Sequence, residues 1–149
     1  MWISGNNLAV IKEEALKSYP HECCGLLLGV IEGEKDKRVI KVVPTKNDWE
    51  NQRHHFNRFQ GTLFDSFAIN PLTFLRIQKK ARQKGLQIVG VYHSHPCHPA
   101  IPSEFDRAVA WPVYSYVIVS VEKGQVKDLT SWCLNEKGIF LEEEIFVDS

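Results

Sequence analysis

One stretch, VGVYHSHP at residues 89–96, decides how the rest of the chain is interpreted. Its apolar start predicts a buried strand, and that strand runs straight into two histidines. Because side chains alternate across a strand, His93 and His95 leave on the same face. Their Cα atoms would be about 6–7 Å apart, which lets both imidazoles reach one metal ion. Asp106, beyond a proline-rich loop, could supply a third ligand.

Length and composition predict a single globular domain spanning residues 1–149, because 44% of the chain is hydrophobic and can form a substantial core. Lys plus Arg and Asp plus Glu number 18 each, so net charge gives no reason to expect a nucleic-acid or membrane partner. The first residues lack the basic and apolar regions of a signal peptide, and no apolar run approaches the roughly 18 residues of a membrane span. We therefore expect a cytoplasmic protein.

The four cysteines predict neither a zinc ribbon nor a disulfide framework. Cys23 and Cys24 are adjacent, Cys97 and Cys133 are distant, and no Cys-x-x-Cys motif occurs. A chain of this length can be held together by its core, so disulfides are not needed. We expect free, buried thiols.

Apolar periodicity and turn residues predict an α/β (α+β) domain with a central mixed sheet. Helices are expected at residues 8–18 with Asn7 as the cap, at 71–84 between Pro71 and Gly85, and at 103–110. Strands are expected at 26–31, 38–44, 86–92, 114–122, 126–134 and 139–147. The region from 45 to 70 has no steady period, and a short strand is predicted there at residues 54–56.

The candidate site residues also have simpler explanations. His93 and His95 could each be satisfied by a backbone carbonyl. Ser103 and Asp106 have the spacing of a capping box, which would explain both without a metal. A catalytic zinc site would instead use three protein ligands and leave one position for water. Such a site needs a general base, and Glu22 is a candidate; the alternative is an exposed acid at a strand end.

Three segments carry a resemblance to a known family: PHECCGLLLG at residues 20–29, GVYHSHP at 90–96 and PSEFD at 102–106. Together they resemble the JAMM/MPN+ (Mov34/MPN/PAD-1) zinc metalloprotease family, whose pattern is a distant Glu, then His-x-His-Pro, a short loop and Ser-x-x-Asp. The compact length is similar to that of the small prokaryotic members. Some of these are peptidases that act on sulfur-carrier proteins, including one that bears a new C-terminal cysteine.

The resemblance implies a strongly curved mixed sheet flanked by helices, the cytidine-deaminase-like JAMM/MPN fold. It implies one Zn²⁺ per chain, held by His93, His95 and Asp106. Glu22 would pass a proton from the zinc-bound water to the leaving amine, and Ser103 would hydrogen-bond the oxyanion instead of capping the helix. The implied enzyme hydrolyses the peptide or isopeptide bond after the C-terminal Gly-Gly of a ubiquitin-like or sulfur-carrier protein. The resemblance is also compatible with a homodimer.

Two features depart from the family's pattern. The aromatic segment, residues 57–69, is longer and richer in aromatic side chains than expected; it could line the channel for the Gly-Gly tail, cover the site or make a dimer contact. His98 is an additional imidazole near the ligands, either solvated or a further metal contact.

The alternative is a non-catalytic scaffold or interaction domain of the same fold. A zinc deaminase is disfavoured, because its His-x-Glu and Pro-Cys-x-x-Cys motifs are both missing.

Overall fold

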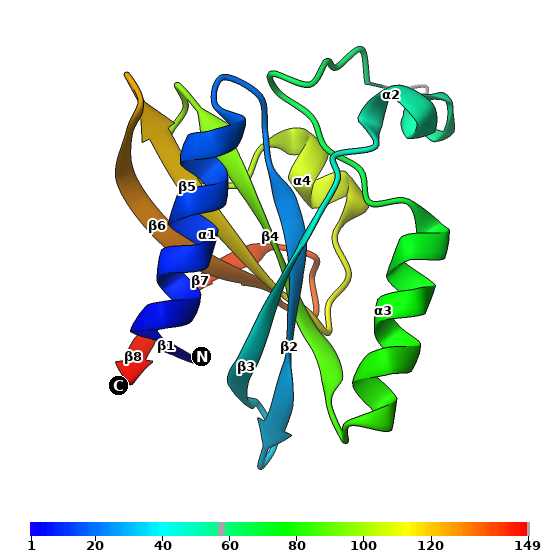
Figure 1. Cartoon of the computed structure of the whole chain (residues 1–149), viewed down its shortest axis with the longest axis vertical. Helices are drawn as coiled ribbons and strands as arrows, with labels where there is room; N and C mark the ends of the chain where they lie inside the picture. Colours follow the sequence, from blue (N-terminus) through cyan, green and yellow to red (C-terminus); the bar gives the residue numbers. More distant parts are fainter. Residues whose placement is uncertain (57–58, 149) are drawn as a thin grey trace.

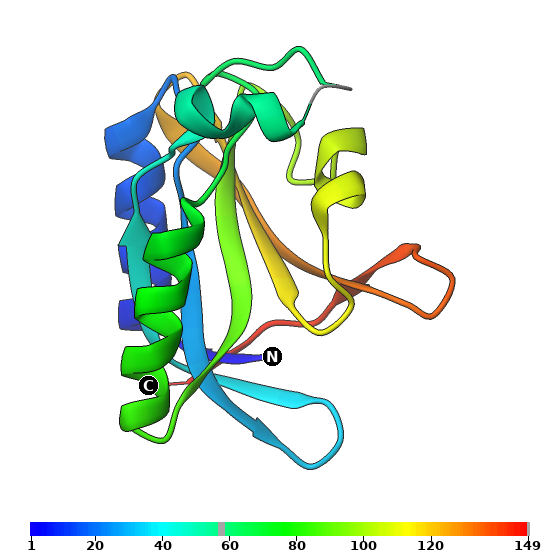
Figure 2. The same ribbon diagram turned by 90° about the vertical axis from the view of Figure 1, so that its right-hand side faces the viewer.

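The chain folds around one mixed and strongly twisted sheet (Figures 1 and 2). The computed structural model describes residues 1–56 and 59–148. Within these residues, the sheet has eight strands in the order β7-β6-β5-β4-β2-β3-β1-β8. The strands are β1 Trp2–Ser4, β2 Cys24–Glu32, β3 Asp36–Thr45, β4 Gln87–Pro96, β5 Ser115–Glu122, β6 Gln125–Leu134, β7 Phe140–Glu143 and β8 Phe146–Asp148. The helical elements are α1 Gly5–Ser18, α2 Trp49–Gln52, η1 Arg53–His55, α3 Pro71–Gln83 and α4 Glu104–Val109.

The central strand β4 carries the two histidines. It is antiparallel to β2 and parallel to β5, and His93 lies opposite Cys24 on one side and Ile118 on the other. β1 runs parallel to both of its neighbours, β3 and β8. The β2–β3, β5–β6 and β6–β7 pairs are antiparallel. The predicted mixed sheet is confirmed.

Both faces of the central strands β2, β4 and β5 are buried along most of their length, because helices pack on each side of the sheet. Leu27 faces α1, whose Ile11 and Ala15 belong to the same core. Its neighbour Leu26 points the opposite way, into a second core that includes Ala81 of α3, as strand alternation requires. Among the described residues, no helix is both long and apolar enough to cross a membrane.

The first helix begins earlier than predicted. α1 starts at Gly5 and is capped by Ser4, whose Oγ accepts a hydrogen bond from the backbone N–H of Asn7 at 3.1 Å. The predicted cap, Asn7, lies inside the first turn and donates from its side chain to the carbonyl of Ile40 at 3.3 Å. Ser and Asn are comparable caps, so spacing alone could not choose between them.

The predicted strand at residues 139–147 is wrong as a single element. The structure divides it into β7 and β8, which lie at opposite edges of the sheet. β8 pairs with β1, a strand that the sequence analysis missed, and the amino group of Met1 donates to the carbonyl of Glu144 at 3.0 Å. Strands of three residues depend on such distant partners and leave little periodic signal.

The predicted strand at residues 54–56 is also wrong. A short helix, α2, runs there into the 3₁₀ helix η1. Trp49 anchors this region: its ring is buried, stacks on Phe56 and donates from Nε1 to the carbonyl of Gly61 at 2.9 Å. Ring packing has overridden the weak local preference for a strand.

All four thiols are free, as predicted, but they are not all buried. Cys23 and Cys24 are buried, Cys133 is half-buried and Cys97 is exposed. Cys97 occupies the turn after β4 with a φ of +62°. This left-handed backbone conformation is uncommon for residues other than glycine and is typical of turns. The prediction of buried thiols is therefore wrong for Cys97 and holds only in part for Cys133.

Candidate metal centre

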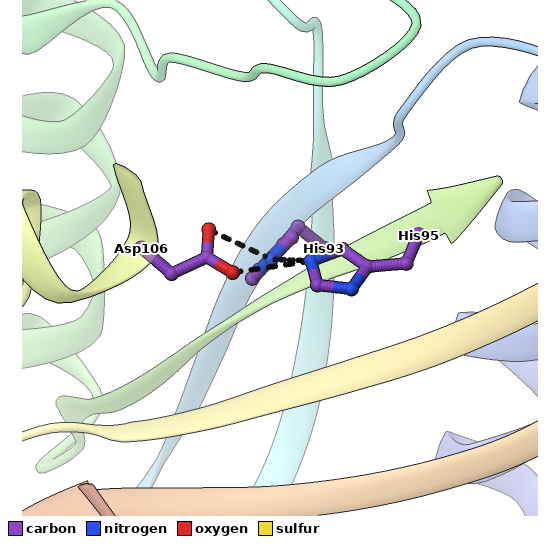
Figure 3. Close-up of side chains that lie close together, drawn as sticks. All are labelled: His93, His95 and Asp106. Carbon is purple, nitrogen blue, oxygen red and sulfur yellow. Dashed lines mark hydrogen bonds and ion pairs between the residues drawn. The ribbon is translucent and has the colours of Figure 1, made fainter. Parts of the chain in front are cut away.

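His93 and His95 belong to β4 itself, because the strand extends to Pro96. Both side chains point to the face on which α4 lies, as the alternation predicts (Figure 3). Ser94 points to the other face, where its Oγ accepts a hydrogen bond from the backbone N–H of Cys23 at 2.8 Å. This bond ties the end of β4 to the residues next to Glu22.

The two imidazoles and the carboxylate of Asp106 converge on one point (Figure 3). The Nε2 atoms of His93 and His95 are 3.0 Å apart, and each lies 3.1 Å from one oxygen of Asp106. All three side chains are buried. Within the described part of the chain, these residues form a group of potential ligand atoms that lie within 4.8 Å of one another. The structure thus brings together the three residues predicted as ligands.

The hydrogen bonds of His95 explain why this arrangement suits a cation. Its Nδ1 lies 2.8 Å from the carbonyl oxygen of Pro99, which can only accept, so Nδ1 carries the proton. Neutral His95 therefore directs a lone pair from Nε2 toward His93 and Asp106. The carboxylate of Asp106 directs lone pairs to the same point. A divalent cation would satisfy these donors together, and the set of two imidazoles and one carboxylate fits zinc.

His93 is held by packing at its other side. The ring of Phe67 stacks on its imidazole, with centroids 4.5 Å apart and an interplanar angle of 19°. Its Nδ1 is buried without a hydrogen-bond partner in the described structure. Nδ1 therefore makes no bond that competes with the role of Nε2, which is the ring nitrogen that faces Asp106 and His95.

Burial and contact set the charge states of the centre. Burial lowers the pKa of His93 and outweighs the opposing effect of Asp106, which favours the neutral imidazole that binds metals. Burial alone would raise the pKa of Asp106, but His93 and His95 outweigh it and hold that pKa well below its usual range. The centre therefore favours a neutral imidazole at His93 and a carboxylate anion at Asp106.

Ser103 and Asp106 are brought to the histidines by a capping box at the start of α4. Ser103 Oγ accepts from the backbone N–H of Asp106 at 3.0 Å, and Asp106 Oδ2 accepts from the backbone N–H of Ser103 at 2.9 Å. The expectation that Ser103 does not cap this helix is wrong. Capping uses only the acceptor side of the hydroxyl, so its proton stays available. The capping box therefore coexists with the convergence of Asp106 on His93 and His95, and it does not exclude a metal site.

Glu22 is a buried acid beside this centre, not an exposed acid at a strand end. It lines a cavity of about 230 Å³ together with His95 and Ser103. Its backbone N–H donates to the carbonyl of Leu63 at 2.8 Å, and its carbonyl accepts from Asn47 Nδ2 at 3.0 Å. Burial raises the pKa of Glu22 well above its ordinary value, and nearby negative charges add to that effect.

The aromatic segment lines the site from the side of Glu22. Residues 57 and 58 lie outside the described residues; in the described part, 59–69, Leu63 holds the backbone of Glu22 and Phe67 stacks on His93. Asp65 lines the same cavity as Glu22. His98 also lines this cavity, is exposed, and is not one of the three converging residues.

Three residues that support the site were missed by sequence analysis: Asn47, Phe67 and Pro99. Asn47 Nδ2 donates to the carbonyls of both Glu22 and Ser66 at 3.0 Å. Pro99 contributes only a backbone carbonyl, which leaves no side-chain signal. Asn47 and Phe67 lie in the region without periodicity, so no pattern marked them.

Comparison with known proteins gives matches across most of the chain. The profile of a family described as prokaryotic homologues of the JAB domain matches residues 6–135. The chain is 34% identical over 129 residues to a desampylase from Pyrococcus furiosus, a match that covers 85% of this chain and 76% of that protein. It is 27% identical over 123 residues to a probable TtuB-protein conjugate cleaving protease from Thermus thermophilus, covering 82% and 71%.

Solved structures share the fold. A protein from Desulfitobacterium hafniense matches with a TM-score of 0.79 and 29% identity, over 99% of this chain and 92% of that one. A JAB1/MPN domain protein from Archaeoglobus fulgidus matches with a TM-score of 0.56 and 21% identity, over 97% and 98%. The predicted α/β JAMM/MPN fold is confirmed.

Proposed function

The chain belongs to the family of prokaryotic homologues of the JAB domain and is a JAMM-type hydrolase, and on that premise we propose that it is a zinc-dependent peptidase. Its proposed substrates are ubiquitin-like or sulfur-carrier proteins, cleaved at the peptide or isopeptide bond after a C-terminal Gly-Gly. The observation that carries this proposal is the convergence of His93, His95 and Asp106 beside a cavity that holds Glu22 and Ser103.

His93, His95 and Asp106 would hold the zinc ion. Zinc in such a site polarises a carbonyl and acidifies water, so that hydrolysis proceeds near neutral pH. Three protein ligands are typical of catalytic zinc, whereas structural sites are usually closed by four. The two imidazoles and one carboxylate support the catalytic type.

Glu22 would take the proton from the attacking water and return it to the leaving amine. A carboxyl group with a raised pKa suits both halves of this task, since it holds a proton more readily than an ordinary carboxylate and can pass it on to the leaving amine. Its backbone is fixed on both sides, by Leu63 and by Asn47, which keeps it at the edge of the cavity.

Ser103 would donate a hydrogen bond to the oxygen that becomes negative during the reaction. Its oxygen already accepts from Asp106, which orients the hydroxyl and leaves its proton for a second acceptor. Donors of this kind typically contribute about 10²–10³ in turnover.

The substrate class is supported by the named relatives and by the cavity. The relatives are a desampylase and a probable TtuB-protein conjugate cleaving protease, which favours conjugates of ubiquitin-like proteins. The cavity is only about 230 Å³, which favours slender groups at the scissile bond, such as the glycines of a Gly-Gly tail.

The test is zinc content together with cleavage of a conjugate. Protein stripped with a chelator and then given zinc should bind about one ion per chain and cleave a ubiquitin-like protein joined through Gly-Gly to a lysine. Protein that binds no zinc and cleaves no such conjugate would instead support the scaffold alternative.

A further inference from the structure

The cavity beside the metal centre is acidic. Besides Glu22, His95 and Ser103, its lining contains Asp65 and His98. Two apolar residues, Pro99 and Ile101, complete it. Among the described lining residues there is neither a lysine nor an arginine. A second anion that entered this cavity would therefore meet the carboxylates of Glu22 and Asp65, and no lysine or arginine of the described lining would offset them.

Asp65 is held in place by bonds at one of its two oxygens. Its Oδ1 accepts from the backbone N–H of Thr62 at 2.8 Å and from Ser66 Oγ at 3.2 Å. Asn47 then ties Ser66 to Glu22 by donating to both carbonyls. Hydrogen bonds thus connect the segments that carry the two carboxylates. Burial is the main cause of the raised pKa of Glu22, and the negative charges of Asp106 and then Asp65 add to it.

The position of Glu22 determines which part of a substrate meets Asp65. Glu22 can return a proton to the leaving nitrogen only if that nitrogen comes within hydrogen-bond reach. The atoms attached to the nitrogen then enter the part of the cavity that Glu22 and Asp65 share.

Two kinds of leaving group differ sharply at this point. If a single amino acid leaves, its α-carboxylate is attached one carbon away from the nitrogen, and it would face the carboxylate of Asp65. A zinc ion held by His93, His95 and Asp106 would offset part of this repulsion, and it would do so whether or not residue 65 is charged. If the side chain of a protein lysine leaves, the neighbouring atoms are uncharged methylenes, which can pack on Pro99 and Ile101. The cavity therefore disfavours a free amino acid as the leaving group and accepts the side chain of a protein lysine.

We infer that Asp65 is a specificity-determining residue, which selects against leaving groups that carry a free carboxylate beside the scissile nitrogen and directs the protein to lysine-linked conjugates. This inference rests on the proposed function and refines its substrate class: conjugates to proteins are cleaved in preference to carriers that bear one C-terminal amino acid.

Three substrates built on one Gly-Gly-tailed carrier test it. The first carries a single C-terminal amino acid with a free carboxylate, the second carries the same amino acid as its carboxamide, and the third is joined to a lysine side chain of a peptide. The rate constant kcat/KM is measured for zinc-loaded protein at pH 8, where an unperturbed imidazole is neutral. The carboxamide and the lysine conjugate should be cleaved at least about tenfold faster than the acid, because like charges in a small cavity repel.

The variant Asp65→Asn should reduce that preference several-fold by accelerating cleavage of the acid relative to the carboxamide, because an effect on Glu22 would change both rates alike. Asp36→Asn is the matched control, since Asp36 is an exposed acid at the β2–β3 turn, and it should leave the preference unchanged. Equal rates for acid and carboxamide in the wild type, or a preference that Asp65→Asn does not alter, would overturn the role of Asp65 but not the proposed function. Failure to cleave all three substrates would overturn the proposed function and this inference with it.

Discussion

The metal centre and the aromatic segment lie side by side, yet the sequence specifies them in opposite ways. The ligands of the metal centre come from one strand end and the following helix, so strand alternation and a helix cap orient them locally. The aromatic segment is placed by distant contacts: Leu63 with Glu22, and Phe67 with His93. The proposed metal ligands are therefore encoded in a short motif, whereas the position of the proposed base, Glu22, depends on tertiary packing.

This contrast predicts that the two regions fail differently when they are altered. Changes in the metal centre should remove zinc and turnover together. Changes in the aromatic segment or in its link to Glu22 should reduce turnover while zinc stays bound. The following variants separate these outcomes, from the largest expected effect to the smallest.

His95→Ala should lose both zinc and activity, because it removes one of three ligands. Loss of a residue that only hydrogen-bonds a metal ligand typically lowers metal affinity by about 10–100-fold. Loss of a ligand itself should therefore lower zinc affinity by more than about 100-fold. His98→Ala is the matched control: an exposed imidazole that lines the same cavity but does not join the cluster. Metal titration checks both variants, and a similar loss of zinc in His98→Ala would place His98 among the ligands.

Ser103→Gly should reduce turnover by about 10²–10³ while zinc stays bound, because it removes the hydroxyl donor. Glycine at a helix cap costs only a few tenths of a kcal/mol relative to serine, so α4 should keep its start. Ser103→Thr retains a hydroxyl and should recover most of the rate. An unchanged rate in Ser103→Gly would reduce Ser103 to a helix cap.

Asn47→Ala should lower turnover and stability but leave zinc affinity within about twofold. It removes the bonds that join the carbonyls of Glu22 and Ser66, and unsatisfied buried groups of this kind cost about 1–3 kcal/mol. Asn51→Ala, which loses only a bond to Asp48, is the control. Loss of zinc in Asn47→Ala would contradict the separation of the two regions.

Glu22→Gln should stabilise the metal-free protein at pH 7 by about 0.5–2 kcal/mol, as is common when a buried functional group is neutralised. The pKa of Glu22 is raised by folding, so its burial has no effect at low pH and destabilises the fold as pH rises above the unfolded value. The advantage of the variant should therefore vanish near pH 4. Unfolding by urea across this pH range checks it, and parallel profiles for variant and wild type would contradict it.

The sequence predicted the metal centre better than its surroundings, for physical reasons. His93 and His95 needed only the alternation of a strand, and Asp106 needed only a cap and a short loop. The role of Glu22 came from family resemblance, because its proximity depends on the pairing of Cys24 with His93 across two strands. Phe67 and the short strand β1 gave no periodic signal at all, since both are defined by partners far along the chain.

The central claim is that the buried carboxyl of Glu22 transfers the proton during hydrolysis, although Glu22 is not itself a ligand of the zinc ion. The most direct measurement is kcat of zinc-loaded Glu22→Gln on a Gly-Gly-lysine conjugate, with zinc content determined on the same sample. The account predicts about one zinc per chain, as in the wild type, and a turnover lower by at least about 10², the contribution of a general base. Wild-type turnover in that variant with zinc fully bound would contradict the account.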